Sequence, residues 1–344
     1  MKGFVARPLK RLGKLFILAV VLDALALFYL QIYFQTPAAP DAKEQIVTIA
    51  AGSSLRQIAD GLADHGLIRH RTMFIVYVKW WHPGPHLQAG EYALRASMSP
   101  EQIVEILRQG KVRHYSLTIP EGLTVREIAT IVAEQHFGDA ATLQALMSDP
   151  VFIASLNLEV PSLEGYLFPD TYRLPRNISA QALLSRMVDT LRINYTDEIV
   201  SRAEQLGLTQ HEVLTLASLI EKEAKVDDER PLISAVYHNR IRKGMLLQCD
   251  PTVIYALGER FDGNIRKQDF EMDSPYNTYR YAGLPPGPIA NPGRRSLEAA
   301  VNPAPVDYLY FVATGSNGQH KFSRTLPEHN QAVHQYLFNM KSQQ

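Results

Sequence analysis

The side chains in this sequence that could do chemistry are mostly carboxylates, and Glu223 is the best placed of them. One predicted helix face, with the spacing i, i+3, i+4 and i+7, carries Leu216, Leu219, Ile220 and Glu223. A carboxylate that continues an apolar stripe points toward the core or into a cleft. Because burial raises the pKa of such a group, Glu223 is suited to act as a general acid near neutral pH.

The helix pattern alone leaves the role of Glu223 open. It is equally consistent with a rim residue that pairs with an arginine. Glu221 lies about 200° from Glu223 around a regular helix, so the two carboxylates cannot share one pocket. The other carboxylates that could accompany Glu223 are Glu164, Asp170, Asp227, Asp228 and Asp250.

Other catalytic chemistries lack the residues that they require. His211-Glu212 is not followed by a second histidine at the zinc-protease spacing, and the eleven histidines are scattered along the chain. No Walker or GxGxxG pattern opens a helix, and there is no GxSxG elbow. Cys249 is the only cysteine, so it forms no disulfide within the chain and has no evident histidine partner. We therefore expect no metal and no cofactor. A membrane-anchored protease is not favoured as an alternative function, because the sequence offers neither a nucleophile nor a metal site for it.

Two loop segments combine aromatic and polar side chains in a way that suits sugars. The apolar faces of sugar rings pack on aromatic rings, while their hydroxyl groups need amides and carboxylates. The residues that we predict to bind substrate are Gln248, Asp250, Tyr276, Asn277, Tyr279 and Glu164. Helix capping is at least as good an explanation for Asp250, and loop ordering is an equal alternative for the others.

Helices and ordered loops must position these side chains. The helix that carries Glu223 is predicted to start with Thr209 as N-cap and Glu212 at N3. Asp250 is predicted as the N-cap of a later helix, with Pro251 at N1. Ordered loops are predicted over Ser162–Pro175 and Asp273–Pro292. Further helices are predicted over Ala180–Leu191, Pro231–Lys243, Ser296–Ala300 and Pro327–Met340. A buried strand is predicted over Tyr308–Ala313, and it pairs with Lys321–Phe322 across a turn at Gly315–Gly318.

An internal repeat lies ahead of these elements. Val47–Ala63 (VTIAAGSSLRQIADGLA) and Leu117–Ala133 (LTIPEGLTVREIATIVA) share seven identical residues at matching places. Each copy predicts a short strand, a glycine turn, a serine or threonine cap and an amphipathic helix. Because two copies are too few for a solenoid, we expect two small βα modules.

The first copy extends into a larger module. Thr72–Trp81 is predicted as a helix or strand, Pro83–His86 as a turn, Ala89–Leu94 as a strand and Pro100–Gln109 as a helix between Ser99 and Gly110. A strand–helix–helix–strand order over residues 45–95 resembles a LysM domain, a fold that binds N-acetylated sugar polymers. A βα module without a ligand is an equal alternative.

An apolar segment near the N-terminus predicts a membrane anchor. Leu15–Phe34 is almost entirely apolar and, at about 1.5 Å per residue, is roughly 30 Å long, which matches a bilayer core. Basic residues precede it without an acidic one, which favours a cytoplasmic N-terminus. A cleavable signal peptide is the alternative, but the apolar stretch exceeds the usual length of about 7–15 residues. Asp23 lies within this span.

The net charge argues against one class of partner. The chain has 35 basic and 35 acidic residues, so its formal charge is zero. Nucleic-acid-binding proteins usually show a basic surplus or patch, and we therefore expect no nucleic-acid partner.

Several long motifs, in order along the chain, resemble the MltG or YceG-like family of endolytic murein transglycosylases. They are EGYLFPDTY (164–172), LASLIEKEA (216–224), LLQCDPTVIYALGER (246–260), SPYNTYRYAGLPPGPIANPG (274–293) and YLYFVA (308–313). The resemblance runs from about residue 45 to 340. It implies cleavage within peptidoglycan strands, between N-acetylmuramic acid and N-acetylglucosamine, to give a 1,6-anhydromuramic end. It also implies a role in ending nascent strands beside peptidoglycan synthases at the inner membrane.

The resemblance implies that Glu223 is the catalytic acid and then the base, and that Glu221 is a bystander. Ala224 stands where a small hydroxyl residue is usual, and Cys249 where a small polar residue is expected. The mechanism that it implies needs one carboxyl group only, because no water has to be held for attack. A muramidase that uses water, and a non-catalytic peptidoglycan-binding scaffold for synthases, are the alternatives.

Together these observations predict an α+β fold with a single N-terminal transmembrane helix, a LysM-like βα module and a mixed α+β catalytic domain. The predicted boundaries are a cytoplasmic N-terminus (1–14), the anchor (15–34), a linker (35–45), the LysM-like module (46–115), a second βα module with a cleft loop (116–185) and the catalytic domain (186–344). We expect a single-pass inner-membrane protein with a periplasmic catalytic domain that acts on peptidoglycan.

Overall fold

The first element of the structure is a long apolar helix, α1 (Ala6–Gln35). The structure is a computed structural model that describes residues 6–81, 87–314 and 318–342. Within α1, the 23 residues Gly13–Gln35 have a mean hydropathy of 2.4 and are long enough to cross a membrane. This confirms the predicted apolar span. The first five residues of the predicted cytoplasmic segment, and the predicted turn at Pro83–His86, lie outside the described residues.

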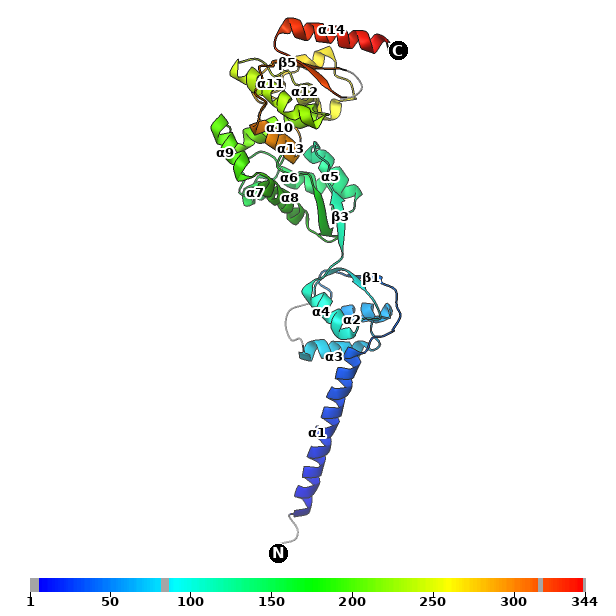
Figure 1. Cartoon of the computed structure of the whole chain (residues 1–344). Helices are drawn as coiled ribbons and strands as arrows, with labels where there is room; N and C mark the ends of the chain where they lie inside the picture. Colours follow the sequence, from blue (N-terminus) through cyan, green and yellow to red (C-terminus); the bar gives the residue numbers. More distant parts are fainter. Residues whose placement is uncertain (1–5, 82–86, 315–317, 343–344) are drawn as a thin grey trace. The chain divides into compact units, whose positions relative to one another are not determined.

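The chain folds into two compact units. The first runs to Tyr115 and includes Arg173–Asn177, and the second comprises Ser116–Tyr172 and the chain from Ile178 onward (Figure 1). The predicted boundary between residues 185 and 186 falls inside helix α8 (Ala180–Asn194) and does not separate two units. The reason is that α8 packs on α6 (Ala140–Met147), so the second βα module shares a core with the rest of the second unit.

Among its described residues, the first unit contains a two-stranded sheet and three helices besides α1. Its strands β1 (Gln45–Ile49) and β2 (Gly90–Leu94) are antiparallel, with Gln45 opposite Leu94, and between them lie α2 (Leu55–Asp64) and α3 (Arg71–Trp81). Helix α4 (Pro100–Gln109) follows, with Ser99 as N-cap and Gly110 in the left-handed conformation at its end. The strand–helix–helix–strand order is thus confirmed, and the LysM resemblance stays a prediction.

The predicted linker is held against this module. Ala39 N–H donates to Ala96 O at 2.9 Å, and the Arg69 guanidinium donates to Pro37 O and Ala38 O. Tyr33 and Phe34, at the end of α1, are buried in the same hydrophobic core as Phe74 and Leu107. Helix α1 and the module are therefore joined by packing as well as by the chain.

The repeat is confirmed in both copies. In the first, Ser54 caps α2 through a capping box with Gln57. In the second, strand β3 (His114–Thr118) leads to α5 (Val125–Glu134), and Thr124 forms the same box with Glu127. Gly52 and Gly122 take positive φ angles of 79° and 76°, which explains the glycine at the matching turn.

The second unit is mainly helical. Its remaining elements are α7 (Pro150–Ser155), α9 (Asp197–Leu206), α10 (Gln210–Glu223), α11 (Arg230–Arg242), α12 (Asp250–Leu257), α13 (Arg294–Val301), β5 (Tyr310–Ala313), β6 (His320–Ser323) and α14 (Leu326–Ser342), with short 3-10 turns at Asp227–Glu229, Gly258–Arg260 and Lys267–Glu271. Strand β4 (Thr171–Pro175) pairs with β3 and forms the end of the predicted loop. Strands β5 and β6 are antiparallel, as expected, but β5 is half-buried and not fully buried. Part of the predicted turn between them, residues 315–317, lies outside the described residues.

Helix α10 is the centre of the second unit, and here the predicted amphipathic pattern is wrong. All eight residues of Val213–Ile220 are buried, because α9, α11, α12 and α13 surround the helix. Its buried hydroxyl groups are satisfied: Ser218 donates to Thr215 O and accepts the Ile289 N–H. An element buried all round is rigid, which suits it to position a reactive side chain at its end.

Candidate active site

Glu223 is the last residue of α10. The helix starts as predicted, with Thr209 and Glu212 in a capping box, and ends where Ala224 takes an extended conformation. The next three residues lead into the 3-10 turn Asp227–Glu229 that precedes α11. Glu223 is therefore held at the end of a buried helix, immediately before the chain turns.

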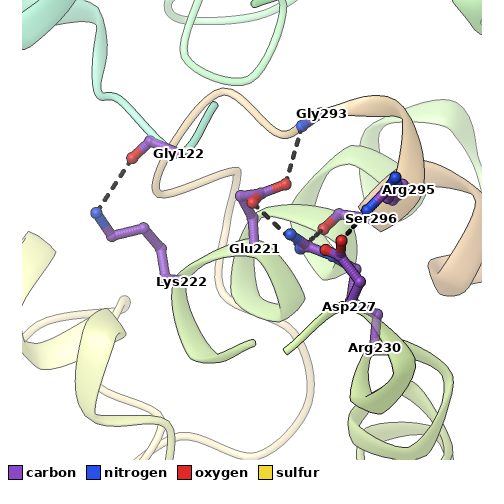
Figure 2. A network of polar contacts seen from close by, with 8 residues as sticks. All are labelled: Gly122, Glu221, Lys222, Asp227, Arg230, Gly293, Arg295 and Ser296. Carbon is purple, nitrogen blue, oxygen red and sulfur yellow. Dashed lines mark hydrogen bonds and ion pairs between the residues drawn. The ribbon is translucent and has the colours of Figure 1, made fainter. Parts of the chain in front are cut away.

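The two residues before Glu223 fix this helix end (Figure 2). Glu221 forms a buried ion pair with Arg230, at 3.1 Å, and accepts the Gly293 N–H at 3.0 Å. Lys222 donates to Gly122 O at 3.1 Å. The arginine partner that was one interpretation of Glu223 thus belongs to Glu221, and the predicted opposition of the two carboxylates around the helix holds.

The ion pair belongs to a larger network. Arg230 also donates to Asp227 at 3.2 Å and to the Ser296 hydroxyl at 2.6 Å, and Arg295 pairs with Asp227 (Figure 2). Helices α10, α11 and α13 are joined at this point. Glu221 therefore stabilises the backbone that carries Glu223.

The Glu223 carboxyl group lies in a desolvated environment. Burial raises the pKa of Glu223 to about 7; hydrogen bonds to Cys249 and Tyr237 and the charge of Lys225 act in the opposite direction, and the charge of Asp250 adds to the rise. The hydroxyl of Tyr237 donates to Glu223 Oε1 at a long 3.5 Å. At neutral pH the group is present in both protonation states, so it is able to give and to take a proton.

Arg240 on α11 shapes the loop opposite Glu223. Its guanidinium donates to the carbonyl groups of Leu246 and Leu247, at 3.1 and 2.9 Å, and to Gln248 Oε1 at 3.3 Å. Gln248 has a positive φ of 52°, and its N–H donates to Thr278 O. This geometry buries Cys249 between two exposed neighbours, Gln248 and Asp250.

Three of the predicted binding residues lie together near Glu223. Gln248 and Asp250 are exposed on the same short segment, and the Tyr279 hydroxyl donates to the Asp250 carboxylate. Burial and the neighbouring Asp250 raise the pKa of Tyr279, with a smaller contribution from Glu223. The predicted N-cap role of Asp250 is wrong: Cys249 occupies that position and Asp250 is the first helical residue, so its carboxylate faces Tyr279.

Asn277 has the alternative, structural role. Its side chain is fully buried, its amide donates to Phe270 O and Met272 O at 2.9 and 2.8 Å, and its oxygen accepts the Tyr279 N–H. With these bonds made, Asn277 orders the loop that presents Tyr279.

Glu164 and Tyr276 belong to a separate buried cluster. Glu164 accepts the Val125 N–H at 3.1 Å and the Asn291 amide at 3.1 Å, and burial raises its pKa to about 8. The Tyr255 hydroxyl also donates to Glu164, and the rings of Tyr255 and Tyr276 lie 4.9 Å apart. This cluster joins the start of α5 to the proline-rich loop.

Three residues that shape the site, Tyr237, Arg240 and Asn291, were not predicted from the sequence. Tyr237 and Arg240 lie one turn apart on α11, and Asn291 accepts the Leu167 N–H while donating to Leu123 O. The sequence held one signal, a tyrosine and an arginine at i and i+3 in the helix predicted over Pro231–Lys243. The partner of Tyr237 ends another helix, and Arg240 bonds to the loop that follows its own helix, so only the fold reveals what the two residues do.

The raised pKa of Glu223 predicts a pH-dependent stability. The carboxyl group holds its proton up to about pH 7 in the folded state but only to its ordinary value of 4.5 when unfolded. Because the folded state binds more protons, stability falls as the pH rises through this window, by an amount on the order of 3 kcal/mol. Urea unfolding should show Glu223→Gln gaining stability over the parent chain from pH 5 to pH 8. If the difference in unfolding free energy between Glu223→Gln and the parent were the same at pH 5 and at pH 8, the raised pKa of Glu223 would be contradicted.

The chain is similar to several known proteins. The sequence profile of the YceG-like family matches residues 47–335. A Bacillus subtilis (strain 168) protein named endolytic murein transglycosylase is 37% identical over 318 residues, which cover 88% of this chain and 87% of the relative. A protein of the same name from Streptococcus pneumoniae serotype 2 is 32% identical over 322 residues, 85% of this chain and 58% of the relative. The crystal structure of the YceG-like protein lmo1499 from Listeria monocytogenes, 39% identical, superposes with a TM-score of 0.58 over 85% of this chain and 99% of that one.

Proposed function

Because the chain belongs to the YceG-like family, we propose that it is an endolytic murein transglycosylase, as its Bacillus and Streptococcus relatives are named. It cleaves peptidoglycan strands internally, between N-acetylmuramic acid and N-acetylglucosamine, and leaves a 1,6-anhydromuramic end. Glu223 acts as the acid and the base, and Gln248, Asp250 and Tyr279 bind the sugars around it. Tyr276, Asn277 and Glu164 support the loops of this site.

The observation that carries the proposal is the environment of Glu223. Its carboxyl group is desolvated, which raises its pKa to about 7, and the residue is fixed at the end of a buried helix. A group that titrates near the working pH suits both halves of a proton-transfer reaction. The charges of Asp250 and Lys225 adjust the pKa of Glu223 in opposite directions, since Asp250 raises it and Lys225 lowers it.

The reaction proceeds in two proton transfers. Protonated Glu223 donates its proton to the glycosidic oxygen as the bond from that oxygen to C1 of the muramic acid breaks. The C6 hydroxyl of the same sugar then attacks C1 and gives its proton to the Glu223 carboxylate. A new C1–O6 bond replaces the broken one, the acid is regenerated and no water is consumed.

The products distinguish this reaction from hydrolysis. Mass spectrometry of peptidoglycan digested by the full chain should show 1,6-anhydromuramic ends, which are one water lighter than reducing ends. The neighbouring Asp250 is the feature that favours the alternative, since a muramidase needs a second carboxylate. Reducing ends in place of anhydro ends would therefore assign the chain as a muramidase. Asp250→Asn, which keeps the shape of the side chain, should lower turnover without changing the product type.

The proposal includes a place in the cell. The apolar span of α1 anchors the chain in the inner membrane with its N-terminus in the cytoplasm, and the catalytic unit acts in the periplasm on nascent strands. The strand–helix–helix–strand module is proposed to bind glycan as LysM domains do. Cleavage close to the membrane would end the elongation of strands beside the synthases that make them.

A scaffold that only recruits synthases is the remaining alternative. Cells that carry Glu223→Gln in place of the parent chain should make longer glycan strands, because ends are no longer created. Normal strand lengths in these cells, with the variant present at the parent level, would favour the scaffold.

A further inference from the structure

Helix α3 of the first unit has an exposed apolar face that the catalytic function does not use. Its inner face, with Phe74, Tyr77 and Val78, is buried in the module core. On another side of the helix Val76 is 39% exposed and Trp80 74%, and Trp81, which follows Tyr77 by four residues on the buried side, is 46% exposed at the end of the helix. These are the only two tryptophans in the chain. Large apolar side chains that are exposed together on one half of a helix indicate a surface that something else covers.

Aromatic packing fixes α3 to the end of the apolar helix α1. The rings of Phe34 and Tyr77 stack with centroids 3.3 Å apart, and Tyr77 stacks in turn on Trp81 at 5.4 Å. The Tyr33 hydroxyl accepts the His70 N–H and donates to His70 O, just ahead of α3. Figure 1 shows α3 crossing the upper end of α1. Within this unit, then, α3 lies at the level where the apolar span ends.

An apolar recess joins the two helices. It has a volume of about 560 Å³ and is lined mainly by Ala26, Leu27 and Leu30 of α1 and by Met73, Val76 and Trp80 of α3. Leu22, Leu25 and Leu27 of α1 are about half exposed. The apolar face of α3 is therefore continuous with the apolar surface of α1 that a bilayer would cover.

We propose that α3 is a membrane-interfacial helix, which inserts its Val76, Trp80 and Trp81 side chains into the outer face of the lipid bilayer. The inference rests on the proposed anchoring of α1 and extends it to a second contact. Phospholipid is the occupant that fits, because acyl chains fill the recess while indole rings settle at the headgroup level. Lys79, which is exposed in the last turn of α3, is long enough to reach the headgroups.

The dimensions of α1 agree with this placement. Asp23, which also lines the recess, precedes Phe34 by eleven residues, a rise of roughly 16 Å along the helix. The recess thus reaches about halfway into a hydrocarbon core of about 30 Å. The consequence is that the module rests on the membrane surface and is not suspended above it.

Tryptophan fluorescence tests the proposal without labels, because both indoles lie in α3. The full chain is reconstituted in phosphatidylethanolamine–phosphatidylglycerol vesicles that contain lipid brominated either near the carboxyl end of the acyl chain or at its middle. We expect loss of roughly half of the emission with the shallow quencher, a smaller loss with the deep one and little quenching by acrylamide. Trp80→Phe and Trp81→Phe each leave a single indole, and the more exposed Trp80 should be quenched more strongly.

The other outcomes each overturn the proposal. Quenching by acrylamide but by neither brominated lipid means that α3 faces water. Protection from acrylamide and from both brominated lipids means that a protein or a second copy covers the helix. Extraction of the same vesicles with alkaline carbonate reports on α1 separately. A chain that is released by carbonate but still quenched by bromine retains the α3 contact and loses the anchor, so the two failures are distinguishable.

Discussion

Replacing Glu223 by glutamine is expected to lower the rate of glycan cleavage by at least roughly 10²–10⁴-fold, the usual contribution of a general acid–base group. The amide has nearly the shape of the carboxyl group, and it accepts the Tyr237 hydroxyl in the same position. It cannot give up and regain a proton at neutral pH. The binding of glycan should change little, so the loss should fall on kcat and not on KM.

The release of anhydromuramic products by the full chain, followed by mass spectrometry, measures this effect. Glu259→Gln is the matched control, because this glutamate is 84% exposed, lies in the same unit and should retain the parent rate. Unfolding is not an alternative explanation, since Glu223→Gln is expected to be at least as stable as the parent at pH 8. A variant with more than a tenth of the parent rate would remove Glu223 from the mechanism, and Glu164, with its pKa of about 8, would be the next carboxyl group to test.

Replacing Arg230 by methionine should destabilise the second unit by about 3–5 kcal/mol, because it leaves the Glu221 carboxylate buried without its ionic partner. The side chains of Arg230 and Glu221 are only 9% and 7% exposed, so water cannot replace the lost contact. The Gly293 N–H still reaches Glu221, which places the expected loss near the lower end of this range. Glycan cleavage should fall as well, since the end of α10 that carries Glu223 loses its attachment to α11 and α13.

Urea unfolding of the full chain, followed by far-UV circular dichroism, gives the change in stability. Arg294→Met is the matched control: it removes an ion pair with Glu298 whose side chains are 60% and 47% exposed, and it should cost less than about 1 kcal/mol. The double variant Glu221→Met/Arg230→Met should recover part of the loss, because no charge is left buried. If Arg230→Met and Arg294→Met had equal effects, the network around Glu221 would have no special part in holding the helix end.

The elements of the fold were predictable where a local signal determines them. Capping boxes at Ser54, Ser99, Thr124 and Thr209 mark helix starts within the few residues that form them, and the structure has a helix at each. The surroundings of α10 were not predictable, because its pattern of buried residues depends on four other helices. Leu216, Leu219 and Ile220 suggested one apolar face, whereas Thr215 and Ser218 are buried too, with their hydroxyl groups bonded to backbone.

The candidate site was predictable only in part for the same reason. Glu223 was found from its place in a helix and from family resemblance, and Gln248 and Asp250 from an exposed loop composition. Asn277 has the same polar character in sequence, but its amide is used inside its own loop. Tyr237 bonds to a residue 14 positions away and Arg240 to residues six to eight positions away, and the helical period of a sequence does not reveal such contacts.

The packing of Phe34 on Tyr77 has a consequence for any shortened form of the protein. A chain that starts after Gln35 loses the apolar helix α1, and it also loses two aromatic rings from the core of the first module. Deleting a buried phenylalanine side chain commonly costs about 3–5 kcal/mol, a large part of the stability of a small domain. Removal of the residues up to Gln35 would make the protein more soluble but would leave the core of the first module incomplete. A chain that starts within α1, one turn before Tyr33, would keep both aromatic rings in that core.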